Sequence, residues 1–144
     1  MNFNKVVVQF KDKTVKKGKT FDFSFNKTIF YMETLDGDIL DIPMESVKAV
    51  FFVRDFKGDK NRHDRYHDAV PGGGKKIRVK FLDGETIVGF SHGYHEGRHG
   101  FFMIPAHLKG NNYRIFVVKS STEEITRITE RAEAVQVAVP SFAY

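Results

Sequence analysis

Hydrophobic and polar residues alternate with a period of two along most of the chain, as in β-strands with one buried face. Val6, Val8 and Phe10 alternate in this way, and Thr20 to Phe25 places three phenylalanines on one predicted face. The other expected strands are 28–35, 38–42, 47–53, 76–81, 86–90, 100–104 and 113–118. The run 47–53 is almost wholly apolar, which is typical of a strand buried on both faces.

Turn residues separate these strands. Asp36-Gly37 and Asp83-Gly84 predict tight hairpins, because glycine adopts positive φ without strain. Residues 11–13 and 109–112 are further expected turns. Gly18 and Gly89 lie where a long strand must bend.

The chain also contains a pattern that recurs after 71 positions. The matches are Val6, Val8, Phe10 and Asp12 with Ile77, Val79, Phe81 and Asp83, then Gly18 with Gly89, Phe23 with Tyr94, and 30–32 with 101–103. At slightly larger shifts 36–37 matches 109–110, and 47–50 matches 125–128. A recurrence in this order predicts an internal tandem repeat.

Two runs of about five strands predict an all-β, or mostly β, protein of two tandem small SH3-like or Sm-like barrels. The expected divisions are a first barrel at 1–54, a charged, glycine-rich linker at 55–74, a second barrel at 75–128 and a tail at 129–144. Residues 121–128 have two readings: a capping box that begins a short C-terminal helix, or the closing strand that the repeat predicts. We favour the strand and leave the tail open.

Composition limits the class of protein. The chain has 144 residues, 41% of them hydrophobic, no cysteine, and no apolar run long enough to cross a membrane. Its first residues lack the apolar stretch of a signal peptide. These features predict a soluble cytoplasmic protein without disulfides.

The net charge of +5 is unevenly distributed. Segment 54–80 contains nine basic and four acidic residues, whereas the rest of the chain holds 14 of each and is neutral. Such a basic segment either steers an anionic partner or is simply a solvated surface.

Three stretches within about 45–120 resemble a poorly characterised bacterial domain: 47–58, 79–85 followed by Gly89, and 100–102 with 110–118. That domain is similar in layout to Sm-like small barrels and occurs beside signalling modules such as PilZ domains. The resemblance implies a regulatory or adaptor role and supplies no active residues. The cyclic-di-GMP motif of PilZ domains is not matched, because Arg62 and Arg65 have the wrong spacing, and the Sm RNA-binding signature is absent as a whole.

Catalytic and metal signatures are weak. No serine lies in a nucleophile elbow, the aspartates at 36, 38 and 41 suit a turn, and the glycines at 72–74 precede a strand rather than a helix. The pair His63 and His67 and the trio His92, His95 and His99 could each hold zinc, but neighbouring glycines give little of the rigidity such a site needs. We therefore expect no enzyme activity, no cofactor and no metal.

The sequence thus predicts a non-enzymatic binding or regulatory module, in bacterial signalling, with a protein or an anionic ligand as partner. The alternative is a small barrel that binds single-stranded RNA or DNA, although most phenylalanines lie at core-like positions. The hypothesised surface joins the basic segment to the histidine-rich loop. Its residues are Arg54, Lys57, Lys60, Arg62, Arg65, Lys75, Lys76, Arg78, Lys80, His92, His95, Arg98 and His99.

Overall fold

The computed structural model describes residues 3–56, 74–92, 98–105 and 111–128, and these are all-β as expected. Ten strands are present, with one 3₁₀ turn, η1 (Met44–Ser46), before β5 and another, η2 (Lys119–Ser121), before β10. The strands are β1 (Asn4–Phe10), β2 (Val15–Thr20), β3 (Ile29–Thr34), β4 (Ile39–Pro43), β5 (Val47–Val53), β6 (Lys75–Phe81), β7 (Thr86–Ser91), β8 (Gly100–Pro105), β9 (Asn112–Val118) and β10 (Thr122–Arg127).

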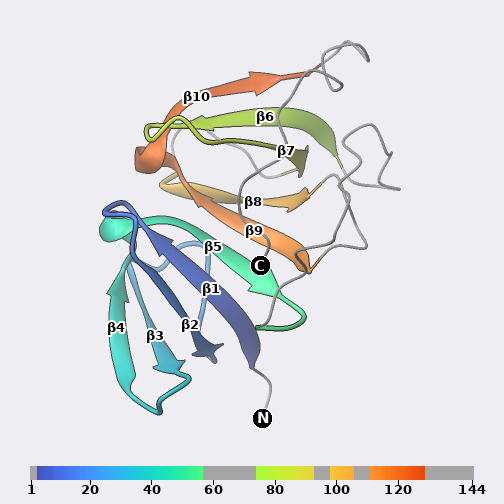
Figure 1. Ribbon diagram of the computed structural model, residues 1–144. Helices are drawn as coiled ribbons and strands as arrows, with labels where there is room; N and C mark the ends of the chain where they lie inside the picture. The colour runs from blue at the N-terminus through green and yellow to red at the C-terminus, as the bar shows by residue number, and fades with distance from the viewer. Residues whose placement is uncertain (1–2, 57–73, 93–97, 106–110, 129–144) are drawn as a thin grey trace.

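All ten strands belong to one antiparallel sheet with the order β10-β6-β7-β8-β9-β5-β1-β2-β3-β4. The first half, β1–β5, and the second half, β6–β10, occupy opposite parts of the molecule (Figure 1). The expectation of two closed barrels is not confirmed, because the sheet is open. Strand β5 pairs with β1 of its own half and with β9 of the other, so hydrogen bonds run from one half into the next.

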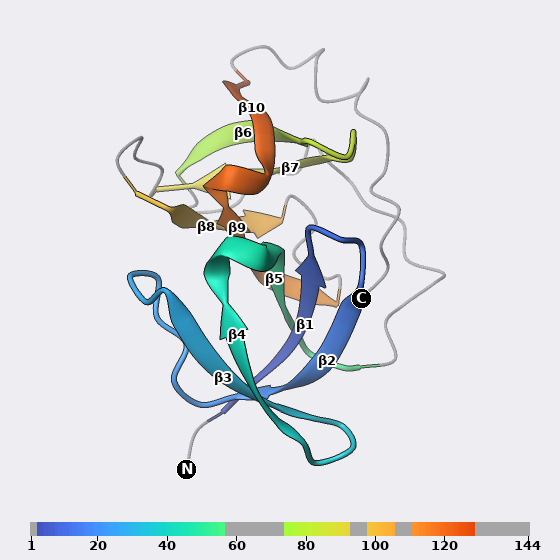
Figure 2. The ribbon, with the colours of Figure 1, turned by 90° about the vertical axis from the view of Figure 1, so that its left-hand side faces the viewer.

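Two hydrophobic clusters lie on opposite faces of this sheet. The cluster of the second half includes Ile77, Phe81 and Met103, and that of the first half includes Phe30 and Met32. The sheet therefore curls towards one face in its first half and towards the other face in its second half (Figure 2).

Strand β5 contributes to both clusters. Val50 and Phe52 pack into the first-half cluster, whereas Phe51 and Val53 pack into the second-half cluster. All seven residues of β5 are buried, which explains why this segment lacks the alternation of a one-sided strand.

Contacts in the first half recur in the second half at the spacing of 71 residues. The N–H of Phe10 donates to the carbonyl of Thr14 at 2.9 Å, and that of Phe81 donates to Glu85 at 2.8 Å. Likewise Gly18 pairs with Thr34 across β2 and β3, and Gly89 pairs with Pro105 across β7 and β8. The expected turns at 36–37 and 83–84 are also present, with positive φ at Gly37 and Gly84.

The expected strand from Thr20 to Phe25 is wrong. Strand β2 covers Val15–Thr20, and the chain then leaves the sheet. Asp22 causes this turn, because its Oδ1 accepts the backbone N–H of Tyr31 at 3.1 Å and so folds the segment back. The phenylalanines consequently separate: Phe23 packs against the first-half core, while Phe25 is exposed.

The strand reading of the C-terminal segment is confirmed. Residues Thr122–Arg127 form β10, which pairs with β6, and the described residues contain no α-helix. The predicted tail 129–144 and most of the predicted linker lie outside the described residues.

Lys48 joins the two halves by an ion pair. It lies where β5 bulges against β1, and only 3% of its surface is exposed. Its ammonium donates to Asp83 Oδ2 at 2.7 Å and to Glu85 Oε1, and it lies 4.6 Å from the centre of the Phe81 ring. Three partners from the second half thus hold a cation from the first half, since a buried charge is tolerated when paired.

Partial burial of Asp83 opposes its ionisation, but the hydrogen bonds from Lys48 and from the N–H of Glu85 hold its pKa below the ordinary value of 3.8. The interaction therefore stabilises the fold fully above pH 3.8 and weakens as the pH falls through the lower pKa of the folded state.

We predict that Asp83→Asn lowers the free energy of unfolding near neutral pH by about 1.5–3 kcal/mol, the range for a charged hydrogen bond. The difference between wild type and variant should shrink below pH 3.8. Urea denaturation at pH 7 and pH 3 measures both, with the exposed Asp38→Asn as control. Equal stability of wild type and Asp83→Asn at pH 7 would contradict the role of this ion pair.

Two glycines allow neighbouring strands to approach closely. A Cβ at Gly18 would lie 2.2 Å from the carbonyl oxygen of Glu33, and a Cβ at Gly89 would lie 2.4 Å from that of Ile104. We predict that Gly18→Ala and Gly89→Ala each destabilise the protein by about 1–3 kcal/mol, because backbone must move. Thermal denaturation monitored by circular dichroism tests this, and a rise in melting temperature for either variant would contradict it.

Candidate functional site: an arginine–aromatic cleft

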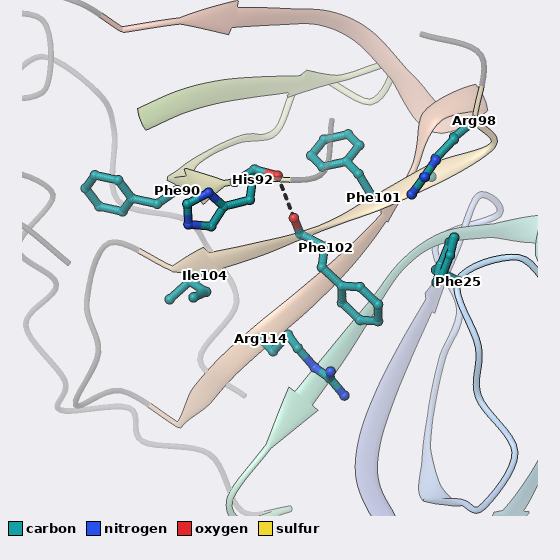
Figure 3. Close-up of a pocket in the computed structure, with 10 residues that line it drawn as sticks. Phe25, Phe90, His92, Arg98, Phe101, Phe102, Ile104 and Arg114 are labelled. Carbon is teal, nitrogen blue, oxygen red and sulfur yellow. Dashed lines mark hydrogen bonds between the residues drawn. The ribbon is translucent and has the colours of Figure 1, made fainter. Parts of the chain in front are cut away.

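A cleft of about 280 Å³ lies on β7, β8 and β9 and is bordered by the segment that follows β2. Aromatic and basic side chains dominate it (Figure 3). The lining residues are Phe25, Phe90, Ser91, His92, Arg98, Gly100, Phe101, Phe102, Ile104 and Arg114. We call this site the arginine–aromatic cleft.

Strand pairing places the floor of the cleft. Phe90 of β7 pairs with Ile104 of β8, and Phe102 of β8 pairs with Phe116 of β9. Since residues two apart on a strand share a face, Phe102 and Ile104 point to one side of β8, while Phe101 and Met103 belong to the second-half core on the other side. The cleft therefore lies on the reverse face of the second-half sheet.

Arg114 is the central basic residue of the cleft. Its guanidinium carbon lies 4.2 Å from the centre of the Phe52 ring and 4.4 Å from that of Phe102. Its Nε is buried and has no hydrogen-bond partner among the described residues. Burial lowers the pKa of Arg114, with the charge of Tyr113 acting in the opposite direction. A guanidinium remains charged under these conditions, so the cleft contains a partly desolvated cation without a carboxylate partner among the described residues.

Arg98 and Phe25 form the rim. The Arg98 guanidinium lies 4.9 Å from the centre of the Phe25 ring, and both residues are exposed. Arg98 lies two residues before β8, whereas Phe25 follows β2 in the first half, so both halves of the sheet contribute to this side of the cleft (Figure 3).

Ser91 has a structural contact in this cleft. Its Oγ donates to the carbonyl oxygen of Phe102 at 2.7 Å, which links β7 to β8 (Figure 3). The neighbouring His92 is exposed at the end of β7.

Basic side chains extend the cleft along β6. The Lys76 ammonium lies 6.0 Å from the centre of the Phe90 ring, and partial burial lowers the pKa of Lys76. Arg78 is two residues further and points to the same face, away from the buried Ile77 and Val79. Lys76 pairs with Phe90, so these two basic residues of β6 lie on the same face of the sheet as the cleft.

The predicted surface is brought together only in part. Its residues Lys76, Arg78, His92 and Arg98 lie in or beside the cleft. The others that the structure describes lie elsewhere: Arg54 stacks on Tyr113, Lys75 lines a second pocket, Lys80 pairs with Glu123, and His99 lines a third pocket. Lys57, Lys60, Arg62, Arg65 and His95 lie outside the described residues.

The sequence reasoning missed Arg114, Phe25 and Phe102. A signal for Arg114 is present, because it occupies the same face of β9 as the fully buried Phe116, where an apolar residue is expected. No local signal marks Phe25, whose position depends on the turn made by Asp22.

Metal and membrane features are not seen in the described ranges. Within residues 3–56, 74–92, 98–105 and 111–128, no three histidine or acidic side chains gather as metal ligands would. In the same ranges, no helix has the length and apolar character needed to cross a bilayer.

The fold and cleft define a class: an open, ten-stranded antiparallel β protein with a basic, aromatic cleft on one face. The family model of DUF6982, a family of unknown function, matches residues 2–129, and the chain belongs to this family. Comparisons with curated proteins and with solved structures found no match.

Proposed function

We propose that this protein is a non-enzymatic binding module and that the arginine–aromatic cleft holds an anionic group of its ligand. The observation that carries the proposal is Arg114, a cation that contacts two phenylalanine rings and has a buried Nε without a partner among the described residues. Charge-assisted hydrogen bonds from a guanidinium are among the strongest polar contacts in proteins.

The physical reason is the cost of leaving a desolvated cation unpaired. Burial removes water from Arg114, and the two aromatic faces replace only part of that solvation. An anion that enters the cleft gains a donor that has little competing solvent. Phe90 and Phe102 beside it offer flat apolar surface, so an anion carried on a planar group fits best.

The wider role is part of the same proposal. The resemblance to a bacterial domain found beside signalling modules supports a regulatory function in the cytoplasm. The hydrogen bonds that recur after 71 residues support an origin of the two halves as duplicated small barrels, SH3-like or Sm-like, that opened and fused at β5.

We predict that inorganic pyrophosphate binds wild type and that Arg114→Met weakens binding by about tenfold or more, as loss of a charged hydrogen bond requires. Methionine retains an apolar stem against Phe52 and Phe102. The control is Lys16→Met, which removes a positive charge from an exposed position on β2.

Titration followed by ¹H–¹⁵N NMR measures this, with the Nε–H signal of Arg114 as the local probe. The expected result is a saturable shift of this signal and of the amides of Phe102 and Ile104, which line the same cleft. Identical affinities for Arg114→Met and Lys16→Met would overturn the assignment of the cleft.

A second candidate function is binding of single-stranded nucleic acid. The observation that favours it is the presence of exposed aromatic rings next to cations: Arg98 on Phe25 at 4.9 Å, and Lys19 on Phe3 at 4.8 Å. Such pairs can stack a base and neutralise its phosphate.

For this second function we predict that a random single-stranded RNA binds with an affinity that falls steeply as salt increases. Phe25→Leu should weaken binding by about 1–3 kcal/mol if a base stacks on this ring. Fluorescence anisotropy measures both, with the exposed Leu35→Ala as control. Absence of binding at low salt would exclude the nucleic-acid function and leave the small-anion function in place.

A further inference from the structure

Among the described residues, one strand pairing joins the two halves of the sheet. Strand β5, the fifth strand of the first half, pairs with β9, the fourth strand of the second half. The pairing is antiparallel and extends from Ala49 opposite Val117 to Val53 opposite Asn112. In this fold, the fifth strand of one half can therefore form an antiparallel pair with the fourth strand of another half.

The complementary pair of strands at the ends of the sheet has no partner among the described residues. Strand β4 is the fourth strand of the first half, and β10 is the fifth strand of the second half. They are the two ends of the ten-stranded order and lie at opposite ends of the molecule in both views (Figures 1 and 2). One chain thus cannot pair its own β4 with its own β10.

We propose that this chain assembles with further copies of itself, and that β4 of one copy pairs with β10 of the next. This contact repeats between molecules the fourth-to-fifth strand pairing that β9 and β5 make within one molecule. Exposed strand edges carry unpaired N–H and C=O groups that favour pairing with another chain. The contact joins two different surfaces, so it is a heterologous, head-to-tail association.

Charge favours the pairing of unlike edges. Residues 28–46, which include β3 and β4, contain five carboxylates and no lysine or arginine. Strand β10 itself contains two glutamates and one arginine, whereas β6 beside it contains four basic residues and no acidic one. The basic residues of β6 and Arg127 attract the acidic hairpin of another copy, and two acidic hairpins repel each other, so charge favours head-to-tail pairing.

Apolar surface at the acidic edge supports the same contact. Ile39 on β4 is 65% exposed, and Leu35 in the preceding turn is 60% exposed. Tyr31 and Ile29 on β3 are also exposed. Four large apolar side chains on one two-stranded hairpin are typical of a surface that another protein covers.

The outward backbone donors of both edges can be identified. Met44 donates its N–H inward to Thr28, and Ile128 donates inward to Lys76. Because donors alternate along an antiparallel strand, the N–H groups of Asp41 on β4 and Arg127 on β10 point outward. A proline at either position removes one outward donor without removing a hydrogen bond within the sheet.

The experiment mixes two variants, each with one blocked edge. Wild type should self-associate in a concentration-dependent way, as measured by light scattering after size-exclusion chromatography. Asp41→Pro alone and Arg127→Pro alone should each be monomeric. The contact needs a β4 edge and a β10 edge, and every copy of one variant has the same edge blocked. Their mixture should form a dimer and stop there, because each retains the edge that the other lacks.

Two controls separate loss of the backbone donor from loss of charge and from unfolding. Asp41→Ala and Arg127→Ala remove the charge but keep the backbone donor, so they should still associate, with weaker affinity. Circular dichroism shows whether each proline variant is folded. A wild type that is monomeric at all concentrations would overturn the proposal, and so would continued self-association of folded Asp41→Pro, which would place the contact on another surface. Neither result would affect the anion-binding function of the cleft.

Discussion

The burial of β5 on both faces is the constraint on which the rest of the structure depends. A strand with apolar side chains on both sides needs a hydrophobic core on each side. In β5, Phe52 packs into the first-half cluster and Phe51 packs into the second-half cluster. Its two edges are also used, by β1 and β9. The two halves therefore cannot separate without exposing the core of both.

The pairing of β5 with β9 also forms part of the candidate site. Arg114 lies on β9 directly opposite Phe52 of β5, so the ring of one half solvates the cation of the other. Phe25, also from the first half, reaches the rim because Asp22 turns the chain out of the sheet. The cleft exists where the sheet changes its direction of curl, and neither half alone carries all of its lining.

The local pattern predicts most strands, because alternation and turn residues are determined within a few positions. The strand 47–53 is predicted with its observed bounds, since its apolar run is uninterrupted. Strand 15–20 was missed, although shifting 86–90 back by 71 places a strand there. Strand 15–20 is rich in lysine, so the more apolar segment 20–25 was predicted as the strand instead. The joining of the two halves into one open sheet and the cleft depend on pairing between residues more than 60 apart, such as Phe52 with Arg114, which local alternation does not encode.

Native-state hydrogen exchange can show whether the shared strand β5 makes the two halves a single cooperative unit. We expect the amides of β5 and β9 to exchange only through global unfolding, with the same free energy as the slowest amides of β1. Both halves should then unfold in one transition. Exchange of β5 or β9 at a clearly lower free energy, or two separate transitions for the two halves, would contradict it.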